Sequence, residues 1–401
     1  MLLPLSDAPN PRGTPVVTWA LIAVNVAVYL LVTLPLGSQP PDPADPALRA
    51  YVEMVRETLP PNVPLQAALR NLSAYDLFVF EHGFRPAAPQ AGDLVSSIFL
   101  HGGFMHLFGN MLFLWIYGDN VEYRLGRLRF LLYYLLTGVA ATLFFTMFAL
   151  DSNVPLVGAS GAISGVLGFY FRWFPRNTVR MFVFLFPFFM NTVEIPARIV
   201  LGIYLFVDNV LPWIFSIGGG GGVAHGAHIG GFVAGLLIAW AMDAREVTGA
   251  PAEYRARGAG PAAPSTAGGV AQAIAEAVTD EEMEAAARAY FALPPTETAR
   301  LLLPAASLAL ADWLATHRHA QAALTVYRRQ LRDHPSGPEA AAAHLGAGLV
   351  QLEQLGQVAP AYQHFLEALE LGPSPEVAAR ARTGLAAIAA HQKLVMRRSV
   401  P

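Results

Sequence analysis

Uncharged apolar stretches dominate the first 242 residues of this chain. A helix that crosses the hydrocarbon core of a bilayer needs about 20 such residues. Only 14% of the 401 residues are charged and 54% are hydrophobic, whereas a soluble domain carries about 25% charged residues. The pattern therefore predicts six membrane-spanning helices, which are Val16–Leu36, Phe104–Tyr117 with its flanks, Phe130–Leu150, Pro155–Phe174, Val193–Phe215 and Val223–Met242.

The composition also excludes several functions. The formal net charge is -3, so the chain offers no positive field for a nucleic acid. The sequence has no cysteine, which removes disulfides, thiolate metal sites and cysteine nucleophiles. We expect neither a metal nor a cofactor.

Arginines indicate the orientation in the membrane. The short connections 122–129 and 172–180 carry three arginines each, whereas acidic residues outnumber arginines in the long loop of about residues 37–97. Basic connections stay in the cytoplasm. We therefore expect a multi-pass protein of the cell (inner) membrane with both termini cytoplasmic and the long loop outside. Met181–Thr192 is apolar but too short to cross, so it is interpreted as re-entrant or interfacial.

The remainder of the chain has the composition of a soluble protein. Residues 1–245 are predicted to form the membrane domain, residues 246–278 a Gly/Ala/Pro-rich linker and residues 279–395 a helical domain, so the fold class is all-α. In the last part, five residues recur at a fixed offset: Leu314, Ala323, Tyr327, Leu331 and Pro335 return as Leu352, Ala361, Phe365, Leu369 and Pro373. This pattern resembles a tetratricopeptide repeat, which implies a protein partner; an unrelated Ala-rich helical bundle is the alternative.

Polar residues within apolar spans are costly and indicate function. Ser160 lies five residues past Pro155, His228 five past Val223, and His106 five past His101. All three spans begin at the outer face in the predicted topology. At about 1.5 Å per residue, the three side chains then share one layer roughly 7 to 8 Å below that face.

A serine beside a histidine in a desolvated pocket suits acyl transfer, because the imidazole takes the hydroxyl proton. No third acid is evident at this depth, so we expect a dyad of Ser160 and His228. The oxyanion donors would be His106, Asn110 and the Ser160 backbone N–H. Glycines around the serine, including Gly158 and Gly161, form small-residue seams that allow close helix packing.

Three ordered motifs, His101–Asn110, Gly158–Gly161 and Ala227–Gly231, resemble those of the rhomboid family of intramembrane serine proteases. The resemblance implies that Ser160 is the nucleophile and His228 the general base. It also implies a structural network after the second span at Glu122–Arg124, a partly membrane-embedded first loop, and a mobile gate helix that opens at Val193–Pro196. Substrates would be single transmembrane helices with small or helix-breaking residues, cut near the outer membrane face.

Other classes fit the sequence less well. The His-Glu-x-x-His motif of zinc proteases is absent, although His225 and His228 with His106 form a conceivable metal set. An aspartyl protease needs two buried aspartates, and Asp119 is alone. A transporter would be expected to show inverted repeats, and the sequence shows none. The main alternative is a non-catalytic rhomboid-like scaffold or chaperone that binds transmembrane clients and docks partners through its tail. For His101, which supports the site in this interpretation, a structural or water-contacting role and a catalytic role both stay open. His225 is interpreted as pocket lining and not as a second base.

Overall fold

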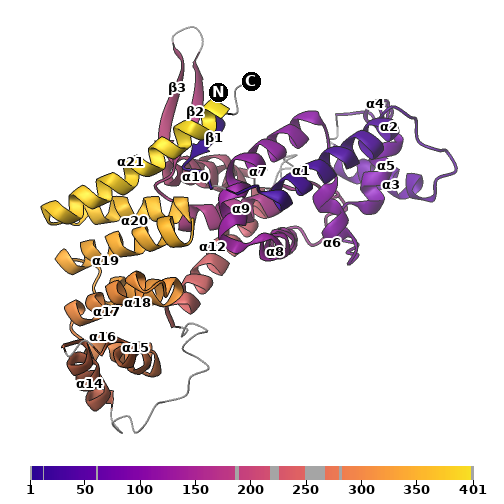
Figure 1. Cartoon of the computed structure of the whole chain (residues 1–401). Coiled ribbons are helices and arrows are strands. Elements are labelled where there is room, and N and C mark those ends of the chain that lie inside the picture. The colour runs from indigo at the N-terminus through magenta and orange to yellow at the C-terminus, as the bar shows by residue number, and fades with distance from the viewer. Residues whose placement is uncertain are drawn as a thin grey trace. The chain divides into compact units, whose positions relative to one another are not determined.

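The computed structural model describes residues 2–11, 13–59, 62–185, 189–216, 225–248, 267–279 and 282–398. The chain divides into two compact units (Figure 1). The first comprises Met1–Asp7 and Gly13–Ala239, and the second comprises Ala8–Arg12 and Trp240–Pro401. Three features predicted from the sequence lie wholly or partly outside the described residues: Val223 at the start of the last span, Pro187, and most of the linker.

Helices occupy all six stretches predicted to span the membrane. The first is α1 (Val16–Val28), which continues through the π-helix η1 (Tyr29–Thr33) into α2 (Leu34–Gly37). The others are α7 (Phe104–Leu125), α8 (Arg127–Thr146), α9 (Ser160–Trp173), the run α10 (Ala197–Leu205), η3 (Phe206–Val210) and α11 (Leu211–Ser216), and α12 (His225–Thr248).

Not every one of these helices is long enough to cross a bilayer by itself. Among the described residues, four pass on length and apolar composition, and a fifth is obtained if α6 (Asp93–Ser96) and η2 (Ser97–Phe99) form one broken span with α7, at a bend of 94°. The helix α9 has 14 residues. Six spans therefore remain a prediction, while a membrane bundle of apolar helices is what the fold supports.

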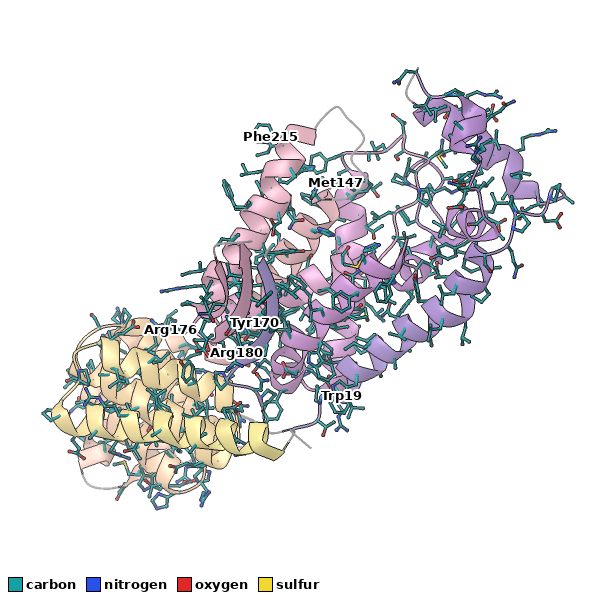
Figure 2. The ribbon with its side chains drawn as sticks, turned by 90° about the horizontal axis from the view of Figure 1, so that it is seen from above. Trp19, Met147, Tyr170, Arg176, Arg180 and Phe215 are labelled. Carbon is teal, nitrogen blue, oxygen red and sulfur yellow. The ribbon has the colours of Figure 1, made fainter. Side chains whose placement is uncertain are left out.

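The surface of the first unit suits a bilayer. Large apolar side chains on its helices are exposed, including Leu128 at 81% and Phe215 at 83%. Exposed apolar surface on this scale is unusual in a soluble monomer. Figure 2 shows Met147 and Phe215 toward one end of this unit, and Arg176 and Arg180 toward the other.

The long loop between the first two spans is itself largely helical. It contains α3 (Pro46–Thr58), α4 (Leu65–Ala68), α5 (Ala74–His82) and α6. The last part of the loop is hydrogen-bonded to the segment that precedes α9. Phe84 and Leu156 exchange backbone hydrogen bonds of 3.1 and 2.8 Å, and the Gly158 N–H donates to the Ser97 carbonyl oxygen at 2.8 Å. The loop thus fixes where α9 begins.

The structure contains a three-stranded sheet that the sequence analysis did not predict. The chain is mostly helical, but this sheet corrects its assignment to the all-α class. Its order is β1 (Leu2–Ala8), β2 (Thr178–Leu185), β3 (Phe189–Pro196). The strands β2 and β3 are antiparallel, with Arg180 opposite Glu194.

The sheet bears on two local predictions. The described parts of Met181–Thr192 are strand, and the ladder between β2 and β3 satisfies their backbone groups. That this stretch is re-entrant or interfacial stays a prediction. Val193–Pro196 ends β3, and the following helix begins at Ala197. The expectation that Val193–Pro196 opens that helix was therefore wrong.

Glycines let α9 and α12 pack backbone against backbone. A Cβ added to Gly231 would lie 2.1 Å from the Gly161 carbonyl oxygen, and one added to Gly235 would lie 2.0 Å from the Gly165 carbonyl oxygen. Any larger residue would therefore force the two helices apart. This is the small-residue seam expected from the sequence, and it joins the helix of Ser160 to the helix of His228.

The second unit is helical. Its elements are α14 (Ala267–Thr279), α15 (Met283–Ala292), α16 (Pro295–Leu301), α17 (Pro304–Thr316), α18 (Ala320–Asp333), α19 (Pro338–Leu349), η4 (Val350–Gln354), α20 (Val358–Glu370) and α21 (Pro375–Arg398). The helix α14 occupies the end of the stretch predicted as a linker, 246–278, and reaches one residue beyond it. Its Ala-rich sequence favours a helix.

A packing contact in this unit repeats along the chain. A Cβ added to Gly346 would lie 2.4 Å from the Tyr327 ring, and one added to Gly384 would lie 2.5 Å from the Phe365 ring. Tyr327 and Phe365 are the aromatic residues that recur in the sequence, and both are buried. Both aromatic rings thus contact a glycine of the helix that follows them, and Phe365 also contacts Gly348 of the helix before it.

Candidate active site

Ser160 and His228 meet at the N-terminal ends of their helices. The Ser160 Oγ lies 2.8 Å from the His228 Nε2, and both residues are half-buried. This is hydrogen-bond distance for an O–H donor and a ring nitrogen. The structure thus brings together the two side chains that were predicted to form a dyad.

The reason for their common depth differs from the one inferred from the sequence. Ser160 is the first residue of α9, not one that lies five residues into a span, because residues 155–159 are not helical. His106 is the third residue of α7 and His228 the fourth of α12. All three lie in the first turn of a helix, so the shared layer follows from where the helices begin.

The Ser160 backbone N–H suits a developing oxyanion. The first four N–H groups of an α-helix have no partner within the helix, and they carry its partial positive charge. Ser160 occupies the first helical position, after Ala159. Its N–H is therefore a donor at the positive end of α9.

Asn110 and His106 lie beside the segment that leads into Ser160. The Asn110 side chain is buried, and no described residue accepts a hydrogen bond from its Nδ2. A Cβ added to Gly158 would lie 2.7 Å from the His106 ring and 3.8 Å from the Asn110 Nδ2. Gly158 also has a φ of 121°, which side chains disfavour. Gly158 is thus required both for this turn and for the approach of His106.

His101 is close to this group but does not touch Ser160. It is buried, its backbone N–H and carbonyl both bond to the Tyr75 hydroxyl, and its ring packs edge-on against His106 at 5.2 Å between centroids. These contacts describe a residue that supports the position of His106.

His225 packs against His228 with 6.4 Å between ring centroids, which leaves it in the surroundings of the base. Among the described residues, no three His, Cys, Asp or Glu side chains come close enough together to hold a metal ion. The set of His225, His228 and His106 considered from the sequence is therefore not assembled as a metal site.

Asn209 is the site residue that the sequence analysis missed. Its Oδ1 lies 2.6 Å from the His228 Nδ1, on the side of the ring opposite Ser160, and its side chain is 1% exposed. Counting inward from Phe215, six residues at about 1.5 Å each place Asn209 roughly 9 Å deep. The same depth argument that selected Ser160 and His228 would have selected this amide.

A small cavity adjoins Ser160. Half of its twelve lining residues are glycine or alanine; the lining is Ser97, Ile98, Gly138, Ala141, Thr142, Leu156, Val157, Gly158, Ser160, Gly161, Ala162 and Ala227. Thr142 is the polar side chain contributed by α8. A side chain that enters this cavity next to the Ser160 hydroxyl must be small.

Comparison with known proteins identifies the same region of the chain. Residues 88–245 match the rhomboid domain. The chain is 31% identical over 156 residues to Rhomboid protein 1, mitochondrial, of Saccharomyces cerevisiae, which is 37% of this chain and 40% of that protein. It is 34% identical over 152 residues to the rhomboid protease GluP of Bacillus subtilis, which is 37% of this chain and 25% of GluP.

A plant relative gives the same result. RHOMBOID-like protein 4 of Arabidopsis thaliana is 34% identical over 155 residues, which is 37% of this chain and 33% of that protein. The chain thus spans less than half the length of each of these three relatives. Together, the domain match and the relatives support the rhomboid family, a family of multi-pass membrane proteins that includes proteases.

Proposed function

We propose that the chain is an intramembrane serine endopeptidase that cleaves transmembrane-helix substrates, with Ser160 as nucleophile and His228 as general base. The observation that carries this proposal is the 2.8 Å contact between the Ser160 Oγ and the His228 Nε2. The rhomboid-domain match over residues 88–245 supports it.

In the acylation step, the Ser160 Oγ–H proton passes to the His228 Nε2 while the Oγ bonds to the substrate carbonyl carbon. The carbonyl π-electron pair moves to oxygen, where the Ser160 N–H, the Asn110 amide and the His106 ring stabilise the negative charge. The C–N bond then breaks, and the His228 proton goes to the leaving amine.

Deacylation repeats these roles with water. His228 takes a proton from the water, whose oxygen attacks the ester carbonyl carbon, and the oxyanion forms in the same place. The ester C–O bond breaks, and the Ser160 Oγ takes the proton back from His228. The small Gly- and Ala-rich cavity beside Ser160 favours a substrate with a small side chain next to the cleaved bond.

The orientation proposed for the enzyme follows from its arginines. The connections 122–129 and 172–180 are placed in the cytoplasm. The helix ends that carry Ser160, His106 and His228 then face the extracytoplasmic side, and cleavage occurs near the outer face of the membrane.

A fluorophosphonate probe tests the nucleophile. The intact chain in detergent should be labelled and should cleave a transmembrane model substrate, and Ser160→Ala should lose both activities. Ser164→Ala is the matched control, since Ser164 lies one turn along the same helix and bonds to the Tyr204 hydroxyl at 2.9 Å. Cleavage that persists in Ser160→Ala would eliminate this proposal, and an inactive but folded wild type would favour the non-catalytic scaffold.

For the second unit, we propose a tetratricopeptide-like docking role for a protein partner. The recurring aromatic-on-glycine contacts of Tyr327 with Gly346 and of Phe365 with Gly384 support a repeating helix pair. Pull-down with residues 267–398 fused to a soluble carrier tests it. A protein that binds this fusion but not the carrier alone would support the docking role.

A further inference from the structure

We infer that Asn209 is a positioning residue that sets the tautomer of His228, so that the reacting unit is Ser160–His228–Asn209. This inference rests on the proposed function, because it concerns the same base. It replaces the two-residue arrangement expected from the sequence with a chain of three side chains.

The hydrogen bonds of Asn209 fix the direction of its amide. The Nδ2 lies 2.8 Å from the Tyr204 carbonyl oxygen, which can only accept. The amide nitrogen must therefore face Tyr204, and the Oδ1 must face His228, where it lies 2.6 Å from the Nδ1. An amide oxygen can only accept, so the hydrogen on the imidazole resides on Nδ1.

This tautomer is the one that a general base needs. With its hydrogen on Nδ1, the neutral imidazole presents a lone pair on Nε2 to the Ser160 hydroxyl, 2.8 Å away. The opposite tautomer would present an N–H to Ser160 and could not take its proton. Asn209 thus acts through His228 without touching the substrate, by holding both the tautomer and the plane of the ring.

The backbone explains why Asn209 reaches this position. It lies in the π-helix η3 (Phe206–Val210), which interrupts the helix between α10 and α11. A π-helix closes bonds between residues five apart, so residue 209 comes back over residue 204. This is the spacing of the Asn209–Tyr204 bond, and π-turns of this kind are frequent at functional sites.

The titratable groups around His228 determine how a substitution at Asn209 affects the protonation of the imidazole. The other titratable side chains that interact with His228 among the described residues are His225, on its own helix, and His106, on α7. Asp208, next to Asn209, interacts with His225. A carboxylate placed at position 209 would be the charge in direct contact with the imidazole.

The experiment uses the full chain in detergent, with cleavage of a transmembrane model substrate and fluorophosphonate labelling as readouts. Asn209→Ala should lower kcat and the labelling rate by about 10- to 100-fold, part of what a general base supplies, with KM unchanged. Asn25→Ala is the matched control, because Asn25 is equally buried and its Nδ2 donates to the Leu21 carbonyl oxygen of its own helix.

The near-isosteric Asn209→Asp keeps the inference testable even if Asn209→Ala does not fold. It restores an acceptor for the Nδ1–H, so it should recover activity relative to Asn209→Ala. Its carboxylate stabilises the imidazolium, so the acidic limb of its pH–rate profile should move upward by on the order of one pH unit. Recovered activity relative to Asn209→Ala, together with the shifted limb, would show that the group at position 209 acts on the His228 ring.

The two proposals fail in different ways. An active wild type that depends on Ser160, with Asn209→Ala as active as Asn25→Ala or with an unshifted limb in Asn209→Asp, would overturn the role of Asn209 alone. A wild type that Ser160→Ala does not impair would overturn the proposed function, and the role of Asn209 with it.

Discussion

At the scale of single residues, the proposed oxyanion donor Asn110 is distinguished by its amide nitrogen, which is unpaired within the described part of the chain. The Asn110 Nδ2 is buried, and no described residue accepts from it. Leaving a buried donor unpaired costs about 1–3 kcal/mol. Such a donor beside Gly158, two residues before Ser160, is explained if an oxyanion binds there during the reaction.

Asn110→Ala should therefore lower kcat by about 10- to 1000-fold, because one oxyanion donor is lost. Stability should change little, since no bond within the described residues is broken. Steady-state cleavage of a transmembrane substrate measures the effect. Asn110→Asp should be at least as impaired, because its carboxylate would face the oxyanion. Full turnover in either variant would remove Asn110 from the oxyanion site.

At the scale of elements, the start of α1 is capped by another helix. Its own N-cap, Pro15, offers no side-chain bond. Glu122, near the end of α7, accepts instead from the Val17 N–H at 3.0 Å, the Thr18 N–H at 2.7 Å and the Thr18 hydroxyl at 2.8 Å. Arg124 lies over the Trp173 ring at 4.2 Å. Glu122–Arg124 is thus the structural network that the family resemblance implied.

Glu122→Gln should destabilise the membrane unit by about 1–3 kcal/mol, since an amide nitrogen cannot accept from these buried donors. The thermal midpoint of the protein in detergent reports the loss. Glu194→Gln is the control, because Glu194 is 61% exposed in its pair with Arg180 and an exposed pair contributes little. Equal midpoints for the two variants would contradict the capping role.

The strand β1 is held to the membrane helices through Asp7. Its Oδ2 accepts from the Asn120 Nδ2 at 2.9 Å and from the Tyr170 hydroxyl, and Asp119 is close enough to interact with it. Burial raises the pKa of the Asp7 carboxyl from its ordinary value of 3.8 to about 7. The protonated form is thus favoured by folding.

A raised acid pKa gives a stability contribution that is complete below pH 3.8 and is lost as the pH rises through about 7. The thermal midpoint of the wild type should therefore rise from pH 8 to pH 5 relative to that of Asp7→Asn, which has no charge to bury. Parallel pH curves for the two proteins would show that Asp7 does not titrate in this range.

At the scale of the whole molecule, the residues of the site belong to one unit. Ser160, His228, Asn209, His106 and Asn110 all lie within Gly13–Ala239. The second unit contributes none of these five residues, so we expect the chemistry not to need its helices.

A chain that ends at Thr248 keeps α12 complete and should cleave a model substrate in detergent at a rate similar to that of the full chain. Comparison of kcat for the two proteins measures this. Loss of native substrates with retention of the model substrate would agree with a docking tail. A folded but inactive truncated protein would show that the second unit belongs to the catalytic fold.

The sequence by itself determined the apolar helices, the small-residue seam and the pairing of Ser160 with His228, because hydropathy and glycine spacing act along one chain segment or one helix face. It did not reveal β1, the hairpin of β2 and β3, or the true start of α9. Strand pairing joins residues far apart in the chain, and the backbone bonds of Leu156 and Gly158 to the long loop fix where α9 begins. The link from Asn209 to His228 likewise required the tertiary structure, since it depends on a π-turn in one helix facing the first turn of another.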